Sequence, residues 1–178
     1  MSDLDTCKRE LATLFAHFVA ETGKNSDWDA ANLGIERYRQ GLYYLTEIGC
    51  AEGTNDDCDY YSSDSMPYLE LWWPINYDKK YYGRGPFQLS YNYNYGAFSK
   101  VFEESTYNNK MELLDNPDRL TEDDYIAFSA GLWFYMNPQS PKPSMHDVMS
   151  GLFEPNDHDE SLGIYGGFSS TINIINGG

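Results

Sequence analysis

The stretch from Tyr81 to Gly96 constrains the fold of this chain more than any other part of its sequence. Two glycines flank Arg84, so the backbone there can take tight turns that other residues resist. After them, polar side chains alternate with apolar ones: Gln88, Ser90, Asn92 and Asn94 with Leu89, Tyr91, Tyr93 and Tyr95. A strand would place amides and rings on opposite faces, whereas a helix would place Ser90 and Asn94 on one face. Either conformation concentrates neutral hydrogen-bonding groups that a core strand does not need.

Hydrophobic periodicity predicts helices before this segment. Residues 5–22 carry apolar side chains at three- and four-residue steps and precede a natural stop at Gly23, so Glu21 lies in the last turn. A carboxylate at a helix C-terminus meets partial negative charge, which disfavours its ionised form and suits a general acid. A second helix is expected from about 34 to 48, with Glu47 near its end.

The rest of the chain predicts further helices joined by long loops. Thr121 predicts the start of a helix that is apolar nearly all round and therefore buried, and Ser144 the cap of a shorter one over 146–152. Residues 50–80 are mostly polar and turn-forming, with an exposed-looking aromatic cluster at 71–74. The expected fold class is mainly α.

Charge and aromatic content restrict the partners. The formal charge of −16 repels nucleic acid and anionic lipid, which both need Lys and Arg. A neutral or cationic partner is the better expectation. The 16 Tyr, 9 Phe and 4 Trp suit a polysaccharide, because aromatic rings stack on sugar rings, although Tyr also fills half-buried positions.

The cysteines and histidines predict no metal site. Cys50 and Cys58 are close in a loop-like stretch and could form a short disulfide, which leaves Cys7 free or paired outside this chain. The histidines are scattered, without zinc spacing, and are expected to be structural or superficial. The acidic start lacks the features of a signal peptide, so either the protein stays inside or the chain begins after a removed segment.

Residues 81–96 closely resemble the signature of family 19 glycoside hydrolases, the chitinases typical of plants, which reads YYGRGP-x-QLS-x-NYNYG. Residues 18–23 resemble the family's helix-end motif S-H-E-T, and residues 43–47 resemble the segment that carries its second carboxylate. Further segments match in the same order: 115–118, 133–136, 142–144, 146–148 and 173–178. The resemblance covers nearly the whole chain.

The resemblance implies a lysozyme-like, two-lobed helical domain with a substrate cleft, spanning 1–178 as a single truncated domain. It implies endo-cleavage of chitin, the β-1,4 polymer of N-acetylglucosamine, with inversion. Glu21 would be the general acid, Glu47 the general base, and Ser90 would position the attacking water. Residues expected to bind the sugar chain are Gln88, Tyr93, Asn94, Asn176 and Trp73. No cofactor is implied, because two carboxylates and water suffice. The partner would be chitin or a chitooligosaccharide, not nucleic acid or membrane, and the protein would be a secreted monomer.

The sequence also departs from the family pattern. Ala20 replaces the histidine before the acid, and Ile75 replaces a cysteine that often follows Trp-Pro. Glu52 is the main rival of Glu47 as the base, because the loop alignment is loose there. Segments that the family has before the first helix and after Asn-Gly-Gly are missing, so we expect this chain to be less stable and less active than a complete domain.

Three other interpretations remain open. One is a peptidoglycan-cleaving enzyme of the same fold, against which the charge of −16 argues. Another is a non-catalytic chitin-binding relative, which the changes around Glu21 and the missing tail keep in view. A purely structural protein would not explain residues 81–96.

Overall fold

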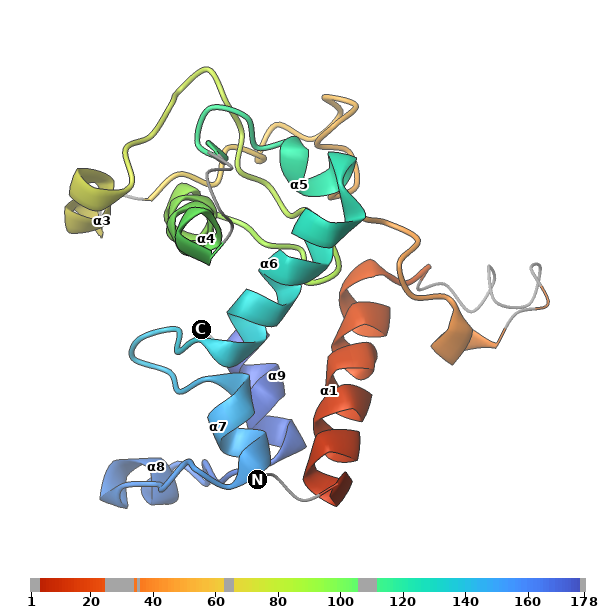
Figure 1. Ribbon diagram of the computed structural model, residues 1–178, viewed down its shortest axis with the longest axis vertical. Coiled ribbons are helices and arrows are strands. Elements are labelled where there is room, and N and C mark those ends of the chain that lie inside the picture. Colours follow the sequence, from red (N-terminus) through yellow and green to blue (C-terminus); the bar gives the residue numbers. More distant parts are fainter. Residues whose placement is uncertain (1–3, 25–33, 35, 63–65, 106–111, 177–178) are drawn as a thin grey trace. The chain divides into compact units, whose positions relative to one another are not determined.

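The computed structural model describes residues 4–24, 34, 36–62, 66–105 and 112–176, and this part of the chain is mainly α-helical (Figure 1). Its helices are α1 (Leu4–Thr22), the 3-10 turn η1 (Arg37–Arg39), α3 (Pro67–Trp72), α4 (Asn92–Ser105), α5 (Arg119–Glu122), α6 (Asp124–Met136), α7 (Met145–Ser150), α8 (Asp157–Ser161) and α9 (Phe168–Asn176). Extended pairing within the described residues is limited to isolated bridges, which join Thr46 to Arg84, Arg84 to Leu89, and Gln139 to Lys142. The expected mainly α fold is confirmed.

The chain forms two compact units. The first comprises Met1–His17 and Leu132–Gly178, and the second comprises Phe18–Gly131. Both boundaries fall inside helices, so α1 and α6 contribute residues to each unit. Every candidate site residue except Asn176 belongs to the second unit. That residues 1–178 form one domain stays a prediction.

In the first unit, α7 packs against α9 (Figure 1). Ser144 caps α7, as expected, because its hydroxyl accepts a hydrogen bond from the Asp147 amide at 2.9 Å. His17 of α1 lies buried with its Nε2 2.8 Å from the Thr171 hydroxyl of α9. Burial lowers the pKa of His17, so the ring is neutral at pH 7 and its expected structural role is confirmed.

In the second unit, residues 81–91 form a folded loop and α4 follows directly. The sequence left open whether this segment is a strand or a helix. The structure has turns and isolated bridges before Asn92 and a helix from Asn92 onward. The core around this junction consists mainly of aromatic and leucine side chains: Tyr81, Phe87, Leu89, Tyr95, Phe98, Leu113 and Leu120. The signature segment is therefore largely internal.

The prediction of a helix over residues 34–48 is wrong. Within the described part of this range the structure has only η1, followed by turns. Leu42 has φ of 61°, in the left-handed region that a helix cannot continue through. The backbone amides of 42–44 bond to Thr22 of α1 instead of to the preceding turn. Tertiary hydrogen bonds thus outweighed the apolar periodicity.

The later helices begin and pack differently from the expectation. Asp123, not Thr121, caps α6: its Oδ1 accepts from the Tyr125 amide at 2.8 Å. The helix is not buried all round, since Ile126 is buried whereas Tyr125 and Leu132 are exposed. The 50–80 loop also contains α3. The sequence did not predict that short helix, which Pro67 starts.

Candidate active site

Glu21 lies in the last turn of α1, and its side chain is half-buried. The helix ends with bonds that satisfy its last carbonyls. The Thr22 hydroxyl donates to the Phe18 carbonyl at 2.5 Å, and the Gly23 amide donates to the Val19 carbonyl at 3.0 Å. These contacts hold the backbone beside Glu21 in one conformation.

Thr22 also holds the chain that leads to Glu47. Its carbonyl accepts hydrogen bonds from the amides of Tyr43 at 3.1 Å and Tyr44 at 2.9 Å. Its hydroxyl oxygen accepts a further bond from the Leu42 amide at 2.7 Å. Residues 42–44 are thereby fixed to the residue that follows Glu21. The segments carrying the two expected catalytic carboxylates are joined at this point.

The Glu47 carboxylate is held through both oxygens. The Gly83 amide donates to Oε2 at 2.8 Å, and the Tyr60 hydroxyl donates to Oε1 at 2.6 Å. The Glu47 amide in turn donates to the Gly83 carbonyl at 2.9 Å. A carboxylate that accepts two such bonds is restrained in orientation, as a general base must be.

Tyr60 is a partner of Glu47 that the sequence did not predict. Burial, together with the hydrogen bond and the negative charge of Glu47, raises the pKa of Tyr60 to about 12. The phenol therefore stays protonated at neutral pH and remains a donor. Its place near Cys58 was visible in the sequence, but its pairing with a carboxylate 13 positions earlier was not.

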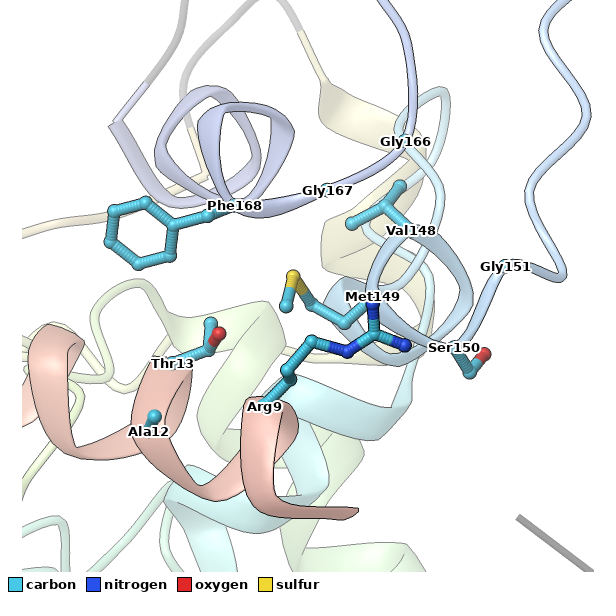
Figure 2. Close-up of a pocket in the computed structure, with 10 residues that line it drawn as sticks. All are labelled: Arg9, Ala12, Thr13, Val148, Met149, Ser150, Gly151, Gly166, Gly167 and Phe168. Atoms are coloured by element: carbon cyan, nitrogen blue, oxygen red, sulfur yellow. The ribbon is translucent and has the colours of Figure 1, made fainter. Parts of the chain in front are cut away.

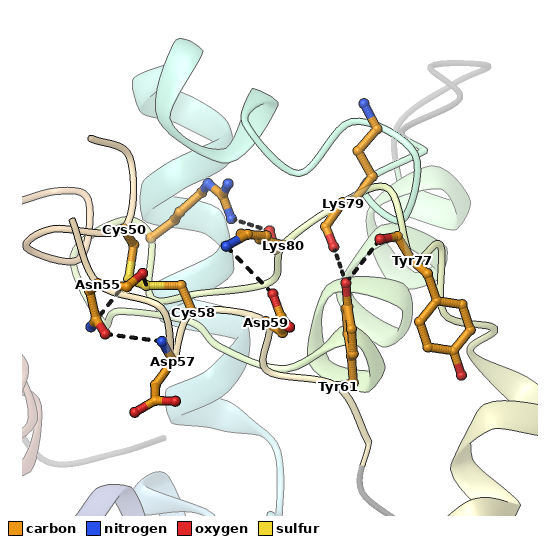
Figure 3. Close-up of polar contacts among 10 residues, drawn as sticks. Cys50, Asn55, Asp57, Cys58, Asp59, Tyr61, Tyr77, Lys79 and Lys80 are labelled. Carbon is orange, nitrogen blue, oxygen red and sulfur yellow. Dashed lines mark hydrogen bonds and ion pairs between the residues drawn. A yellow bond between two sulfur atoms is a disulfide. The ribbon is translucent and has the colours of Figure 1, made fainter. Parts of the chain in front are cut away.

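The disulfide loop positions Tyr60. Cys50 and Cys58 are bonded, as the spacing allowed (Figure 3). They pack against Tyr82, with Tyr60 at the edge of the cluster. Inside the loop, the Glu52 carboxylate accepts from the Gly49 amide at 3.1 Å. Glu52, the alternative candidate for the base, thus caps a turn of its own loop and is exposed.

Arg84 anchors the loop that supplies the Gly83 amide. Its side chain is 3% exposed, and its guanidinium lies 3.6 Å from the Tyr82 ring centroid. It donates to the Lys80 carbonyl at 3.0 Å, to the Tyr95 hydroxyl at 2.9 Å and to Asp118 at 2.6 Å. A buried guanidinium needs several acceptors, and here they come from three separate segments.

The polar residues of the signature form a chain of contacts with one another. Gln88 donates from Nε2 to the carbonyls of Tyr44 and Gly85, each at 3.1 Å. The Ser90 hydroxyl donates to the Gln88 carbonyl at 2.9 Å, and the Asn94 side chain donates from Nδ2 to the Ser90 carbonyl at 2.9 Å. The structure thus brings these three predicted residues together and links them to the 42–47 segment. The Nε2 group of Gln88 therefore has a structural role.

Tyr93 lies in the first turn of α4, and Trp73 packs against the same helix. Tyr93 is half-buried and stacks on Tyr91 with ring centroids 5.4 Å apart. The Trp73 ring packs on Gly96, where an added Cβ would lie 2.5 Å from Trp73 Cε3. Asn176 ends α9 in the first unit and is exposed, so its role is a separate prediction.

A pocket of about 710 Å³ lies in the first unit, between α1, α7 and the start of α9 (Figure 2). Its lining is mainly apolar or small: Arg9, Ala12, Thr13, Val148, Met149, Ser150, Gly151, Gly166, Gly167 and Phe168. None of the predicted site residues lines it. Among the described residues, no group of three or more His, Cys, Asp or Glu is placed to hold a metal ion.

The sequence matches the family model described as chitinase class I, of glycoside hydrolase family 19, over residues 1–178. The chain belongs to this family. The resemblance that the 81–96 segment indicated is confirmed, and with it the lysozyme-like helical fold class.

Plant relatives in this family match nearly the whole chain. It is 41% identical to inactive chitinase-like protein 1 of Hevea brasiliensis, 38% to endochitinase 1 of Solanum tuberosum and 39% to basic endochitinase of Vitis vinifera. Each match covers 99% of this chain but only 48–49% of the relative. The chain therefore spans about half the length of these relatives.

Solved family 19 structures share the fold. A bacterial family 19 chitinase is 30% identical, with a TM-score of 0.58, over 99% of this chain and 65% of that one. The class IV chitinase of Zea mays is 26% identical, with a TM-score of 0.54, over 98% and 59%.

Proposed function

We propose that this chain carries the catalytic carboxylates of an endo-acting, inverting chitinase, with Glu21 as the general acid and Glu47 as the general base. The observation that carries the proposal is the Glu47 carboxylate, held by the Gly83 amide and the Tyr60 hydroxyl. Gly83 belongs to the family signature, and Thr22 ties the Glu21 helix to the segment of Glu47. This is the restraint that a base needs.

The chemistry follows from two carboxyl groups on opposite faces of the sugar. Protonated Glu21 gives its proton to the glycosidic oxygen as the C1–O bond breaks. Ionised Glu47 takes a proton from a water whose oxygen forms the new bond to C1 from the other side, which inverts the anomeric centre. The mechanism requires the carboxyl groups to be about 6.5–9.5 Å apart, so that the water fits between them.

The remaining site residues are proposed to bind and orient the substrate. Ser90 would position the water. Asn94 and Tyr93 would contact the sugar chain. Gln88 would contact it through its side-chain oxygen Oε1, because its Nε2 donates to the protein backbone. A further contact is proposed for Trp73, and a sugar-binding role for Asn176 stays a separate proposal that rests on the family resemblance. No metal or organic cofactor is needed for this chemistry.

The test is hydrolysis of a soluble chitin hexamer, with the anomer of the first product followed by NMR. We expect the wild type to release α-anomer, and Glu21→Gln and Glu47→Gln to lose at least about a thousandfold in rate, given the 10²–10⁴-fold contribution of each proton transfer. Glu52→Gln is the matched control and should keep its rate, because Glu52 only caps its own loop. Loss of activity in Glu52→Gln with retention in Glu47→Gln would reverse the assignment of the base.

A non-catalytic chitin-binding protein is the second candidate. The observation that favours it is the 41% identical Hevea brasiliensis relative, which is named inactive. Ala20, beside the proposed acid, is the departure to test. Hexamer binding without any cleavage, also in Ala20→His, would establish this second function.

The proposed setting is outside the cell. The Cys50–Cys58 disulfide fits an oxidising compartment, where such bonds persist. No helix among the described residues is long and apolar enough to cross a membrane.

A further inference from the structure

Helix α3 carries exposed apolar side chains that the proposed active site does not use. Tyr68, Leu71 and Trp72 are 59%, 85% and 73% exposed. Their spacing of three and four residues places them on one face of the helix. Tyr77, in the loop that follows, is 68% exposed. We call Tyr68, Leu71 and Trp72 the α3 platform. Grouped exposed apolar side chains of this kind mark interaction sites.

The other side of α3 is fixed to α4, and the two helices lie near each other (Figure 1). Trp73, directly after α3, packs on Gly96, and its carbonyl accepts from Nδ2 of the buried Asn92 side chain at 2.8 Å. Asn92 also accepts from the Ser62 amide at 2.6 Å, so it holds the chain on both sides of the helix. The platform therefore sits on an anchored support.

Tyr77 is tied to the same support. Its hydroxyl donates to the Glu70 carboxylate of α3 at 3.1 Å. The Tyr61 hydroxyl lies 2.9 Å from the Lys79 carbonyl and 3.2 Å from the Tyr77 carbonyl, which holds the turn (Figure 3). Beside Tyr77 is a hollow of about 520 Å³, lined by residues 74–78, Leu114 and Asp115.

The platform continues towards a residue of the proposed active site. Tyr93 is held in the neutral form because burial raises its pKa, and the nearby Tyr91 and Tyr68 add to the effect. Tyr68 of the platform therefore lies near Tyr93, which is proposed to contact sugar. A polymer bound at Tyr93 has an apolar surface beside it along which to extend.

We propose that the α3 platform is an accessory binding surface for a chitin chain, with the Trp72 indole as the main stacking ring. This rests on the proposed chitin-directed function but concerns residues outside its catalytic site. The flat rings of Trp72 and Tyr68 match the apolar faces of pyranose rings. The charge of −16 disfavours an acidic protein or nucleic acid as the occupant.

The test compares adsorption to insoluble chitin with hydrolysis of the soluble hexamer. Trp72→Ala should lower the partition constant on insoluble chitin about 3- to 10-fold, the size expected for one lost ring contact. Trp72→Phe should recover most of the binding, and hexamer hydrolysis should not change. The matched control is Tyr165→Ala, which removes an exposed aromatic ring in the first unit and should adsorb like the wild type.

The outcomes separate this inference from the proposed function. Equal adsorption of the wild type and Trp72→Ala, with hexamer hydrolysis intact, would overturn the accessory surface alone. A wild type that adsorbs through Trp72 but does not hydrolyse the hexamer would support the surface and refute the chitinase proposal. If sedimentation shows that Trp72→Ala dissociates a wild-type dimer while adsorption is unchanged, the platform binds a second copy and the inference is wrong.

Discussion

Among single residues, Tyr60 bears most directly on how the proposed base is held, because its hydroxyl donates to Glu47. Its backbone φ of 51° is unusual for a tyrosine, and its carbonyl accepts from the Asn92 amide at 3.3 Å. Its ring meets Tyr91 edge-on at 5.2 Å. The backbone and the ring are thus both constrained, which directs the hydroxyl at Glu47. We infer that Tyr60 is a positioning residue for the base.

Tyr60→Phe should therefore lower kcat with little change in KM. A hydrogen bond to a charged group is worth about 1.5–3 kcal/mol, which corresponds to a loss of roughly 10- to 100-fold in rate.

Tyr61→Phe is the neighbouring control, since that hydroxyl donates to backbone carbonyls of the 77–79 turn. Steady-state kinetics of the two variants would distinguish the two tyrosines. An unchanged kcat in Tyr60→Phe, with a lower melting temperature, would mean that Tyr60 is only structural.

At the scale of elements, the contact of Trp73 with α4 decides how closely the α3 region can approach. Glycine is a poor helix residue, and Gly96 inside α4 costs about 1 kcal/mol relative to alanine. The structure explains its presence, because any Cβ there would enter the Trp73 ring. The close approach compensates for the lower helix propensity.

Gly96→Ala is therefore expected to destabilise the protein by about 1–2 kcal/mol, because the overpacking cost exceeds the gain in helix propensity. In a Trp73→Ala background the same change should be neutral or stabilising, since the ring is gone. Urea unfolding of the four proteins forms a double-mutant cycle that isolates the contact. Equal effects of Gly96→Ala in both backgrounds would show that the ring does not restrict this position.

For the whole molecule, the dominant property is the charge of −16. The formal charge arises from 28 acidic and 12 basic residues, and one of the basic ones, Arg84, is buried. The surface thus has few cations to offset the field. Deacetylation of chitin produces glucosamine units, which carry ammonium groups at acidic pH. The negative protein would therefore attract partly deacetylated chitin over a distance of about one Debye length.

Adsorption to partly deacetylated chitin at about pH 5.5 should accordingly fall several-fold between roughly 20 mM and 500 mM NaCl, as screening shortens the range of the attraction. Adsorption to fully acetylated chitin should change little, since stacking and hydrogen bonds do not depend on long-range charge. Depletion assays on both materials would measure this. The same salt dependence on both would contradict an electrostatic contribution.

Local features of the sequence were enough to predict several parts of this fold. The periodicity of residues 5–22 gave α1 and the place of Glu21, and Ser144 gave the start of α7. Such features depend on neighbours within a few positions, so the sequence alone is sufficient for them. The signature at 81–96 identified the family.

Contacts between distant segments decided the rest. The 34–48 region has helical periodicity, yet its amides bond to Thr22 and to the 83–85 loop because those partners compete successfully with a local helix. For the same reason, Tyr60 and Gly83 could not be recognised as partners of Glu47 before the chain had folded. The sequence by itself determined which residues are available for the chemistry. Only the tertiary structure decided which donors hold the proposed base, because those donors come from 13 and 36 positions away.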